Sequence, residues 1–168
     1  MTFKESVRDK LTIAAKQYSK LVGVDFVLHS LDFKYRTEYL LRFHKDNFLH
    51  LTGVLTNLKA IDFYEKCFNQ TITLDDFVCD SSDELKGKIK EKLKNMSNIG
   101  TFFQRKLVFQ EMFEKNRVKC KLSTSDGQYT IGFISINSFV HVPLTLLNKN
   151  QIAAKDQIVN VAVTIHKK

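Results

Sequence analysis

The sequence is poor in the residues that mark fibrous and disordered chains. One proline and six glycines in 168 residues exclude collagen and proline-rich linkers. With 43% hydrophobic residues, among them 14 Phe and 5 Tyr, the chain is not a charged disordered segment without core formers. No apolar run approaches the roughly 18 to 20 residues that cross a bilayer, and the N-terminus has no apolar signal region. We therefore expect a single globular domain over residues 1–168 that is cytoplasmic and does not contact a membrane.

Cysteine is also scarce. The three cysteines, Cys67, Cys79 and Cys120, are odd in number and far apart, and none is part of a CxxC motif. A disulfide framework or a cysteine metal site would need closer and paired spacing. The sequence therefore indicates reduced thiols, as expected inside a cell.

Positive charge is in excess and unevenly distributed. The 26 basic and 18 acidic residues leave a net charge of +8. The stretch from Lys86 to Lys121 holds 11 Lys or Arg and 3 Glu, which accounts for the whole excess. Such a stretch is typical of a polyanion binder, because lysine and arginine release counterions when they neutralise phosphates. The alternative is a solvated helix face.

In the first hundred residues, apolar spacing mainly predicts helices. It indicates helices over 3–21 and 60–68, and a third over about 82–96, while alternation over 24–28 and 39–43 predicts a hairpin or two short strands. We expect Asp46 to cap a short helix that begins near Phe48. Five acidic residues between 75 and 84 resemble a metal site, but a capping box of Ser81 and Glu84 and the helix dipole explain them without a cation.

The last 60 residues are predominantly extended. A hairpin is predicted over 118–133 with its turn at 125–127, followed by a strand that stops at Pro143 and a last strand over 157–165. Residues 102–113 fit a strand, a helix, or one followed by the other. Ile134 and Ile136 fall out of step, so the second hairpin strand either bulges there or is buried on both faces.

Together these segments predict an α+β fold, in which N-terminal helices pack on a C-terminal antiparallel sheet. Within it we expect an N-terminal helix over 1–22, a mixed and mostly helical part over 24–100, and a mainly antiparallel sheet over 101–168.

The chemistry that remains after motif analysis is metal-free. The phosphate-binding loop, the dinucleotide fingerprint, HExxH and GxSxG are all absent, and the acidic residues do not converge on a metal. We therefore expect no metal and no other cofactor. RNA permits such chemistry, because its 2′-OH attacks the neighbouring phosphate once a side chain removes the proton.

Two residues are candidates for that chemistry. His50 lies between apolar anchors and is followed by Gly53, although a histidine in such a setting is also typical of a core position. Arg105, next to Lys106, carries charge inside an apolar segment, where an unpaired buried charge costs several kcal/mol. We expect the side chains of Arg105 and Lys106 to face a cleft or a partner. The alternative is that they extend into solvent at a sheet edge.

Five segments resemble one protein family in the order in which they occur: Tyr39–Val54, Asn57–Ile61, Arg105, Tyr129–Phe133 and Val142–Leu147. The most specific piece is the aromatic strand followed by Phe48-x-His50-Leu51-x-Gly53. Over roughly residues 24–165 the chain resembles the barnase/EndoU/colicin/RelE-like nucleases of phages and mobile elements. Members of this broader fold are small metal-independent ribonucleases and toxins.

The resemblance implies roles for three residues. His50 would be the general base or acid, Arg105 would stabilise the phosphorane, and the Thr145 hydroxyl would bind the scissile phosphate. Val142 and Leu146 stand where members usually show a second aromatic residue or a serine, so the pocket departs from the pattern.

The resulting hypothesis is a metal-independent endoribonuclease, acting as a toxin or phage effector, that leaves a cyclic phosphate. The rival is a non-enzymatic inhibitor or adaptor that binds nucleic acid or a host complex. RNA is the expected partner, and a toxin would add a cognate antitoxin or immunity protein, while the sequence predicts no oligomeric state. We expect six basic side chains to contact nucleic acid: Arg42, Lys45, Lys88, Lys92, Lys106 and Lys119.

Overall fold

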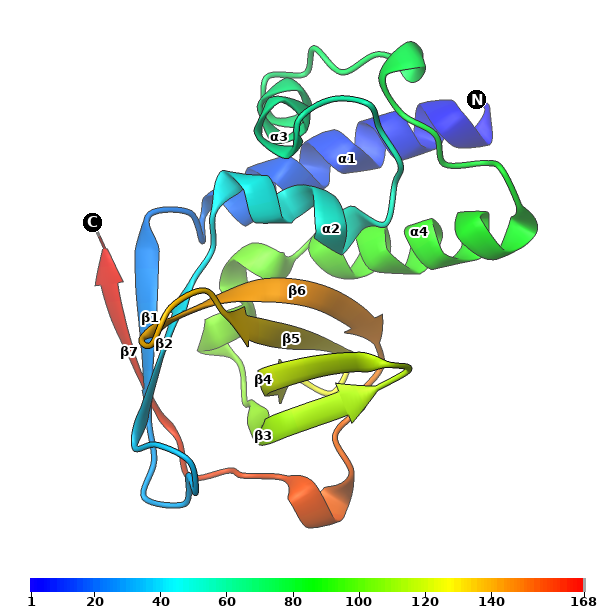
Figure 1. Ribbon diagram of the computed structural model, residues 1–168. Helices are drawn as coiled ribbons and strands as arrows, with labels where there is room; N and C mark the ends of the chain where they lie inside the picture. The colour runs from blue at the N-terminus through cyan, green and yellow to red at the C-terminus, as the bar shows by residue number, and fades with distance from the viewer. Residues whose placement is uncertain (168) are drawn as a thin grey trace. The chain divides into compact units, whose positions relative to one another are not determined.

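The computed structural model describes residues 1–167, and their contacts divide the chain into two compact units (Figure 1). We call residues 1–22 with 44–100 the helical unit. The sheet unit consists of residues 23–43 with 101–167. No helix among the described residues has the length and apolar character that crossing a bilayer requires.

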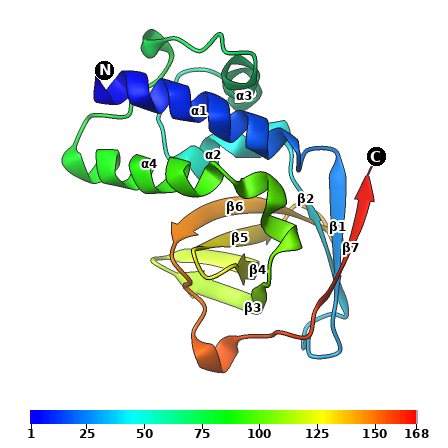
Figure 2. The ribbon, with the colours of Figure 1, turned by 180° about the vertical axis from the view of Figure 1, so that it is seen from behind.

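The helical unit is built on four α-helices and two short 3₁₀ turns. These are α1 (Phe3–Ser19), η1 (Lys45–Asn47), α2 (Phe48–Thr52), α3 (Ala60–Phe68), η2 (Leu74–Asp76) and α4 (Asp83–Met96). Figures 1 and 2 both show α1 between α3 and α4. The core contains the rings of Tyr18, Phe48 and Tyr64, whose centroids lie 5.4 to 5.9 Å apart. Burial of these rings holds the helices together, because large aromatic side chains dominate core energetics.

The predicted helices are confirmed, but two of their starts differ. Ser82, not Ser81, caps α4, since its side chain accepts a hydrogen bond from the Leu85 N–H. Asp46 does not cap α2. It lies inside η1, which directly precedes α2 in the chain. The acidic residues between 75 and 84 lie mainly in η2 and the first turn of α4. There, Asp76 accepts a hydrogen bond from the Thr73 N–H.

The sheet unit is one seven-stranded sheet in the order β3-β4-β5-β6-β2-β1-β7. The strands are β1 (Val24–His29), β2 (Glu38–Arg42), β3 (Val108–Lys115), β4 (Val118–Ser125), β5 (Tyr129–Ser135), β6 (Val140–Asn148) and β7 (Ala162–Lys167). Neighbouring strands are antiparallel except β2 and β6, which pair in parallel at Leu40 and Val140. Four buried rings fill its interior: Phe26, Phe43, Phe103 and Phe133.

The sheet curls so that its two ends approach each other. β3 and β7 are the edge strands, and Ile158, just before β7, exchanges two backbone hydrogen bonds of 2.9 and 2.7 Å with Phe109 of β3. This bridge covers part of the β3 edge, which would otherwise expose unpaired backbone groups.

Residues 99–104 form the 3₁₀ helix η3 (Ile99–Gln104), and β3 follows it, which agrees with the alternative of a helix followed by a strand. Two other details of the sheet correct the sequence prediction. β6 does not stop at Pro143, because the β5–β6 register shifts between Gly132 and Phe133 and places Pro143 opposite Phe133. Such an irregularity accommodates a residue without an N–H. The extra residue of this irregularity is Leu144 of β6, and residues 129–133 of β5 are all buried, so burial on both faces is the alternative that holds for this part of β5. The last strand begins at Ala162 rather than at residue 157.

The α+β class predicted from the sequence is confirmed, with a seven-stranded and mostly antiparallel sheet. The sheet is not exclusively C-terminal. Its first two strands come from residues 24–42, and one strand pair is parallel. The single-domain prediction stays a prediction.

Candidate active site and nucleic-acid interface

His50 lies on the solvent side of a short, well-anchored helix. Phe48, Leu51 and Thr52 of α2 are buried, which leaves the His50 side chain exposed. The Thr52 hydroxyl donates a hydrogen bond of 2.7 Å to the Leu49 carbonyl, and Gly53 ends the helix at a φ of 76°. Within residues 1–167 no hydrogen bond or ion pair holds the imidazole. His50 is therefore not a core residue, and its ring is accessible for proton transfer.

Lys92 of α4 packs beside the end of this helix. A Cβ added at Gly53 would lie 3.1 Å from Lys92 Cδ and 3.5 Å from Cε, and the positive φ disfavours a side chain there in any case. Burial lowers the pKa of Lys92, and the charge of Lys88 lowers it further. The glycine after His50 thus lets a half-buried lysine lie against the backbone of the His50 segment.

The other predicted nucleic-acid contacts differ in how far they are already paired. Arg42 makes two hydrogen bonds of 2.8 and 2.9 Å to Asp25. Lys45 pairs with Glu65 at 2.8 Å, and Lys88 with Glu84 at 3.1 Å. The Lys45 and Lys88 pairs are exposed, where an ion pair contributes about 0 to 1 kcal/mol, so phosphate can compete for these two cations. Asp25 is buried, so Arg42 is held more firmly.

Lys106 and Lys119 are exposed and belong to no ion pair among residues 1–167. They need not give up a carboxylate to bind phosphate. The basic stretch from Lys86 to Lys121 is shared by the two units, since α4 belongs to the helical unit and residues from 101 onward to the sheet unit.

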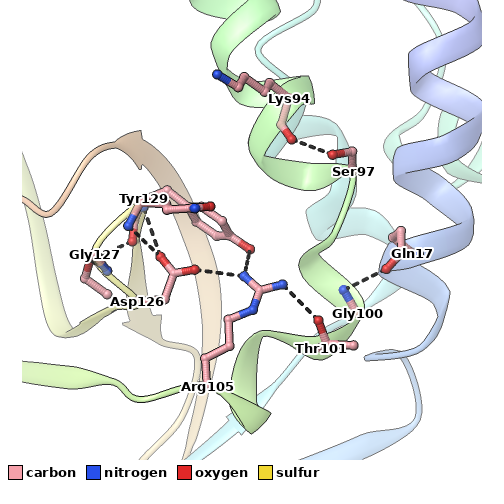
Figure 3. Close-up of polar contacts among 11 residues, drawn as sticks. Gln17, Lys94, Ser97, Gly100, Thr101, Arg105, Asp126, Gly127 and Tyr129 are labelled. Carbon is pink, nitrogen blue, oxygen red and sulfur yellow. Dashed lines mark hydrogen bonds and ion pairs between the residues drawn. The ribbon is translucent and has the colours of Figure 1, made fainter.

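Arg105 is held by a polar network inside the sheet unit (Figure 3). Its Nη1 donates to Asp126 Oδ2 at 2.8 Å and to the Tyr129 hydroxyl at 3.2 Å, while Nη2 donates to Thr101 Oγ1 at 2.8 Å. The Arg105 side chain is 24% exposed and that of Asp126 is 4% exposed. Burial alone lowers the pKa of Arg105, but the hydrogen bond to Asp126 and the interactions with Tyr129 raise it overall.

Asp126 also organises the β4–β5 turn. Its Oδ1 accepts hydrogen bonds of 2.9 and 3.1 Å from the N–H groups of Gln128 and Tyr129. Burial raises the pKa of Tyr129 to about 12, although Arg105 opposes the shift. The predicted requirement of Arg105 for a partner is therefore met by an internal carboxylate, and a substrate phosphate would have to share that guanidinium.

Thr145 is half-buried in β6, opposite Gly132 of β5. A Cβ at Gly132 would lie 3.0 Å from Thr145 Cγ2 and 2.5 Å from Cys120 Sγ. Only glycine therefore lets these two side chains approach each other across β5. Among residues 1–167 the Thr145 hydroxyl makes no hydrogen bond.

His50 belongs to the helical unit, whereas Arg105 and Thr145 belong to the sheet unit. Their joint action on one phosphate stays a prediction. Sequence patterns missed Asp126 as the partner of Arg105. The described residues contain no group of three or more His, Cys, Asp or Glu side chains that could hold a metal ion.

Comparison with known proteins identifies the class to which this fold and these residues belong. The chain is a member of the family described as phage-Barnase-EndoU-ColicinE5/D-RelE like nuclease 4, whose family model matches residues 10–168. The resemblance first noted around Phe48–Gly53 is thereby confirmed. No curated protein and no solved structure matches the chain. Membership in a nuclease family implies a nucleic-acid substrate.

Proposed function

We propose that the chain is a metal-independent endoribonuclease that acts as a toxin or phage effector. In its reaction the 2′-oxygen of a ribose forms a bond to the adjacent phosphorus and the bond from phosphorus to the 5′-oxygen breaks. One group removes the 2′-OH proton, and one returns a proton to the leaving oxygen. The products are a 2′,3′-cyclic phosphate and a free 5′-OH.

The observation that carries this proposal is the exposed imidazole of His50, on an anchored helix, in a chain of a nuclease family. We assign one of the two proton transfers to His50, because histidine titrates near neutral pH. Arg105 stabilises the charge of the phosphorane, and the Thr145 hydroxyl donates a hydrogen bond to a phosphate oxygen.

The experiment is cleavage of a mixed-sequence RNA in excess EDTA. We expect fragments with cyclic phosphate ends by mass spectrometry, and a rate about 10² to 10⁴ times lower for His50→Gln, the typical contribution of a general acid or base. His29→Gln is a matched control, since His29 is also exposed but carries no assigned role. Loss of cleavage on chelation would contradict the mechanism.

The non-enzymatic binder remains the second candidate, and one observation favours it. Arg105 is already paired with Asp126 at 2.8 Å, as expected if it only holds the β4–β5 turn. An inactive chain that still binds RNA tightly in EDTA would support this alternative. A toxin role predicts that induced expression arrests growth and that His50→Gln relieves the arrest. An antitoxin or immunity protein would then appear as a second chain that restores growth to cells expressing the unaltered protein.

A further inference from the structure

A groove opens in the sheet unit where two paired strands separate. β4 pairs with β5 from Leu122 to Ser125, whereas the described residues of β4 before Leu122 pair with β3 alone. The gap forms a groove of about 340 Å³ whose lining includes Met112, Phe113, Cys120 and Ile134. Its volume falls within the range of small-molecule sites, and its lining is largely apolar, as in sites that take a flat ring.

The edge of this groove is positively charged. Lys119 and Lys121 line it from β4, and both are exposed. Glu114 lies opposite Lys119 in the β3–β4 register, yet no ion pair between them occurs in the described residues, and the lysines outnumber this carboxylate. An apolar floor beside two ammonium groups matches a nucleotide, which joins a flat base to an anionic phosphate.

Two exposed aromatic rings lie at the start of the parallel strand pair formed by β2 and β6. Parallel strands begin at the same end of a sheet, so the loops that precede β2 and β6 lie together. Arg36 Nη1 joins these loops by a hydrogen bond of 2.9 Å to the Ser138 carbonyl. Their neighbours Tyr35 and Phe139 are 62% and 74% exposed, more than any other aromatic side chain described.

The groove and these loops form one continuous surface. Ser135 lines the groove, and its hydroxyl donates a hydrogen bond of 2.6 Å to Asn137 in the loop before β6. Burial lowers the pKa of His141, and the charges of Arg36 and, more weakly, Lys121 lower it further.

We propose that this surface binds an unpaired stretch of the RNA substrate. One base stacks on Phe139, another enters the groove, and the phosphates between them contact Arg36, Lys119 and Lys121. Exposed aromatic rings among basic side chains are the usual means of binding single strands. A duplex does not fit, because its bases are paired and stacked and cannot enter a groove.

The proposal rests on the proposed function only for the identity of the ligand. Its test therefore uses a labelled ten-nucleotide 2′-O-methyl RNA, which lacks the attacking hydroxyl and is not cleaved by this mechanism. Affinity is measured by fluorescence anisotropy in EDTA, for the strand alone and for its blunt duplex. We expect the single strand to bind at least ten times more tightly than the duplex.

Variants then test each part of the surface. Phe139→Ala should weaken single-strand binding about 5- to 100-fold, the effect of losing one stacked base. Phe139→Leu should also bind the single strand more weakly than the unaltered protein, because leucine has no aromatic ring on which a base can stack. Leu31→Ala is the matched control, since this loop side chain is 89% exposed and has no role in the surface. The double variant Lys119→Gln, Lys121→Gln should reduce the salt slope by about 0.7 per lost contact, and Lys155→Gln should not change it.

Equal affinities for Phe139→Ala and the unaltered protein would overturn the proposal, as would full binding by Phe139→Leu, preference for the duplex or absence of single-strand binding. Binding to anionic vesicles or to a protein partner in place of RNA would also overturn it. Unchanged thermal unfolding of each variant confirms that it folds. Binding with the expected losses but without RNA cleavage would refute the proposed function alone, and cleavage without these losses would refute this inference alone.

Discussion

Replacing Arg105 by glutamine removes the positive charge from the network around the β4–β5 turn. The change breaks the hydrogen bonds to Asp126, Tyr129 and Thr101 and leaves a carboxylate that is 4% exposed without its cation. Breaking a fully buried pair costs about 3 to 5 kcal/mol. Because Arg105 is 24% exposed and water screens it partly, we expect a loss of about 2 to 4 kcal/mol in the free energy of unfolding.

Asp126→Asn is the matched variant. An asparagine oxygen still accepts the N–H groups of Gln128 and Tyr129, so this change removes mainly the charge, at about 1 to 3 kcal/mol. Urea unfolding followed by circular dichroism gives both values and that of the double variant. We expect a coupling energy of about 1 to 3 kcal/mol. Strictly additive losses would show that the ion pair does not stabilise the turn, and would refute this reasoning.

The same variants separate a structural Arg105 from a catalytic one. RNA cleavage is compared under conditions in which all variants are folded. If Arg105 stabilises the phosphorane, Arg105→Gln should lower kcat/KM about 10²-fold or more, whereas Asp126→Asn should lower it much less. Equal and small effects of both variants would show that Arg105 only holds the turn.

Three further predictions concern packing, pH and salt. Gly132→Ala should destabilise the protein by about 1 to 3 kcal/mol through overpacking. Gly87→Ala should stabilise the protein by up to about 1 kcal/mol, because Gly87 lies inside α4 and an added Cβ would contact nothing within 4 Å. A higher melting temperature for Gly132→Ala than for Gly87→Ala would contradict this. Because burial lowers the pKa of folded His141 below its usual 6.5, the unfolded state binds its proton first, so stability should fall as the pH drops below about 6.5 and level off below the folded pKa. His141→Gln should lack this component in urea unfolding at pH 8, 6 and 5, and parallel curves would argue against it. Neutralising the exposed Lys90 and Lys94 should flatten the salt dependence of RNA binding by about 0.7 per lost contact, and an unchanged slope would mean that this part of α4 is only solvated.

Local patterns predicted the elements that depend on neighbouring residues. Helical spacing found α1 and α3, and alternation found the β1–β2 and β4–β5 hairpins. The solvent-facing position of His50 also follows from α2, since Phe48 and Leu51 turn inward. Pro143 was misjudged, because a proline can continue a strand where the pairing is irregular, and this irregularity appears only when β6 pairs with β5.

Pairings between distant residues could not be predicted in this way. Nothing near Leu40 indicates a parallel partner at Val140, a hundred positions further along the chain. Arg105 required a partner on energetic grounds, but the carboxylate that fills this role comes from a turn 21 residues away. The groove beside Lys121 depends on where the pairing of β4 with β5 stops, which no local pattern records.

Neither unit is contiguous in the chain, which passes between them after Val22, Phe43 and Gly100. No single cut can therefore separate them. A fragment that ends at Gly100 would contain the helical unit together with the β1–β2 hairpin, which would lack the rest of its sheet. Isolated hairpins are only marginally stable in water. To exchange the helical unit between related proteins, residues 1–22 and residues 44–100 would have to be replaced together.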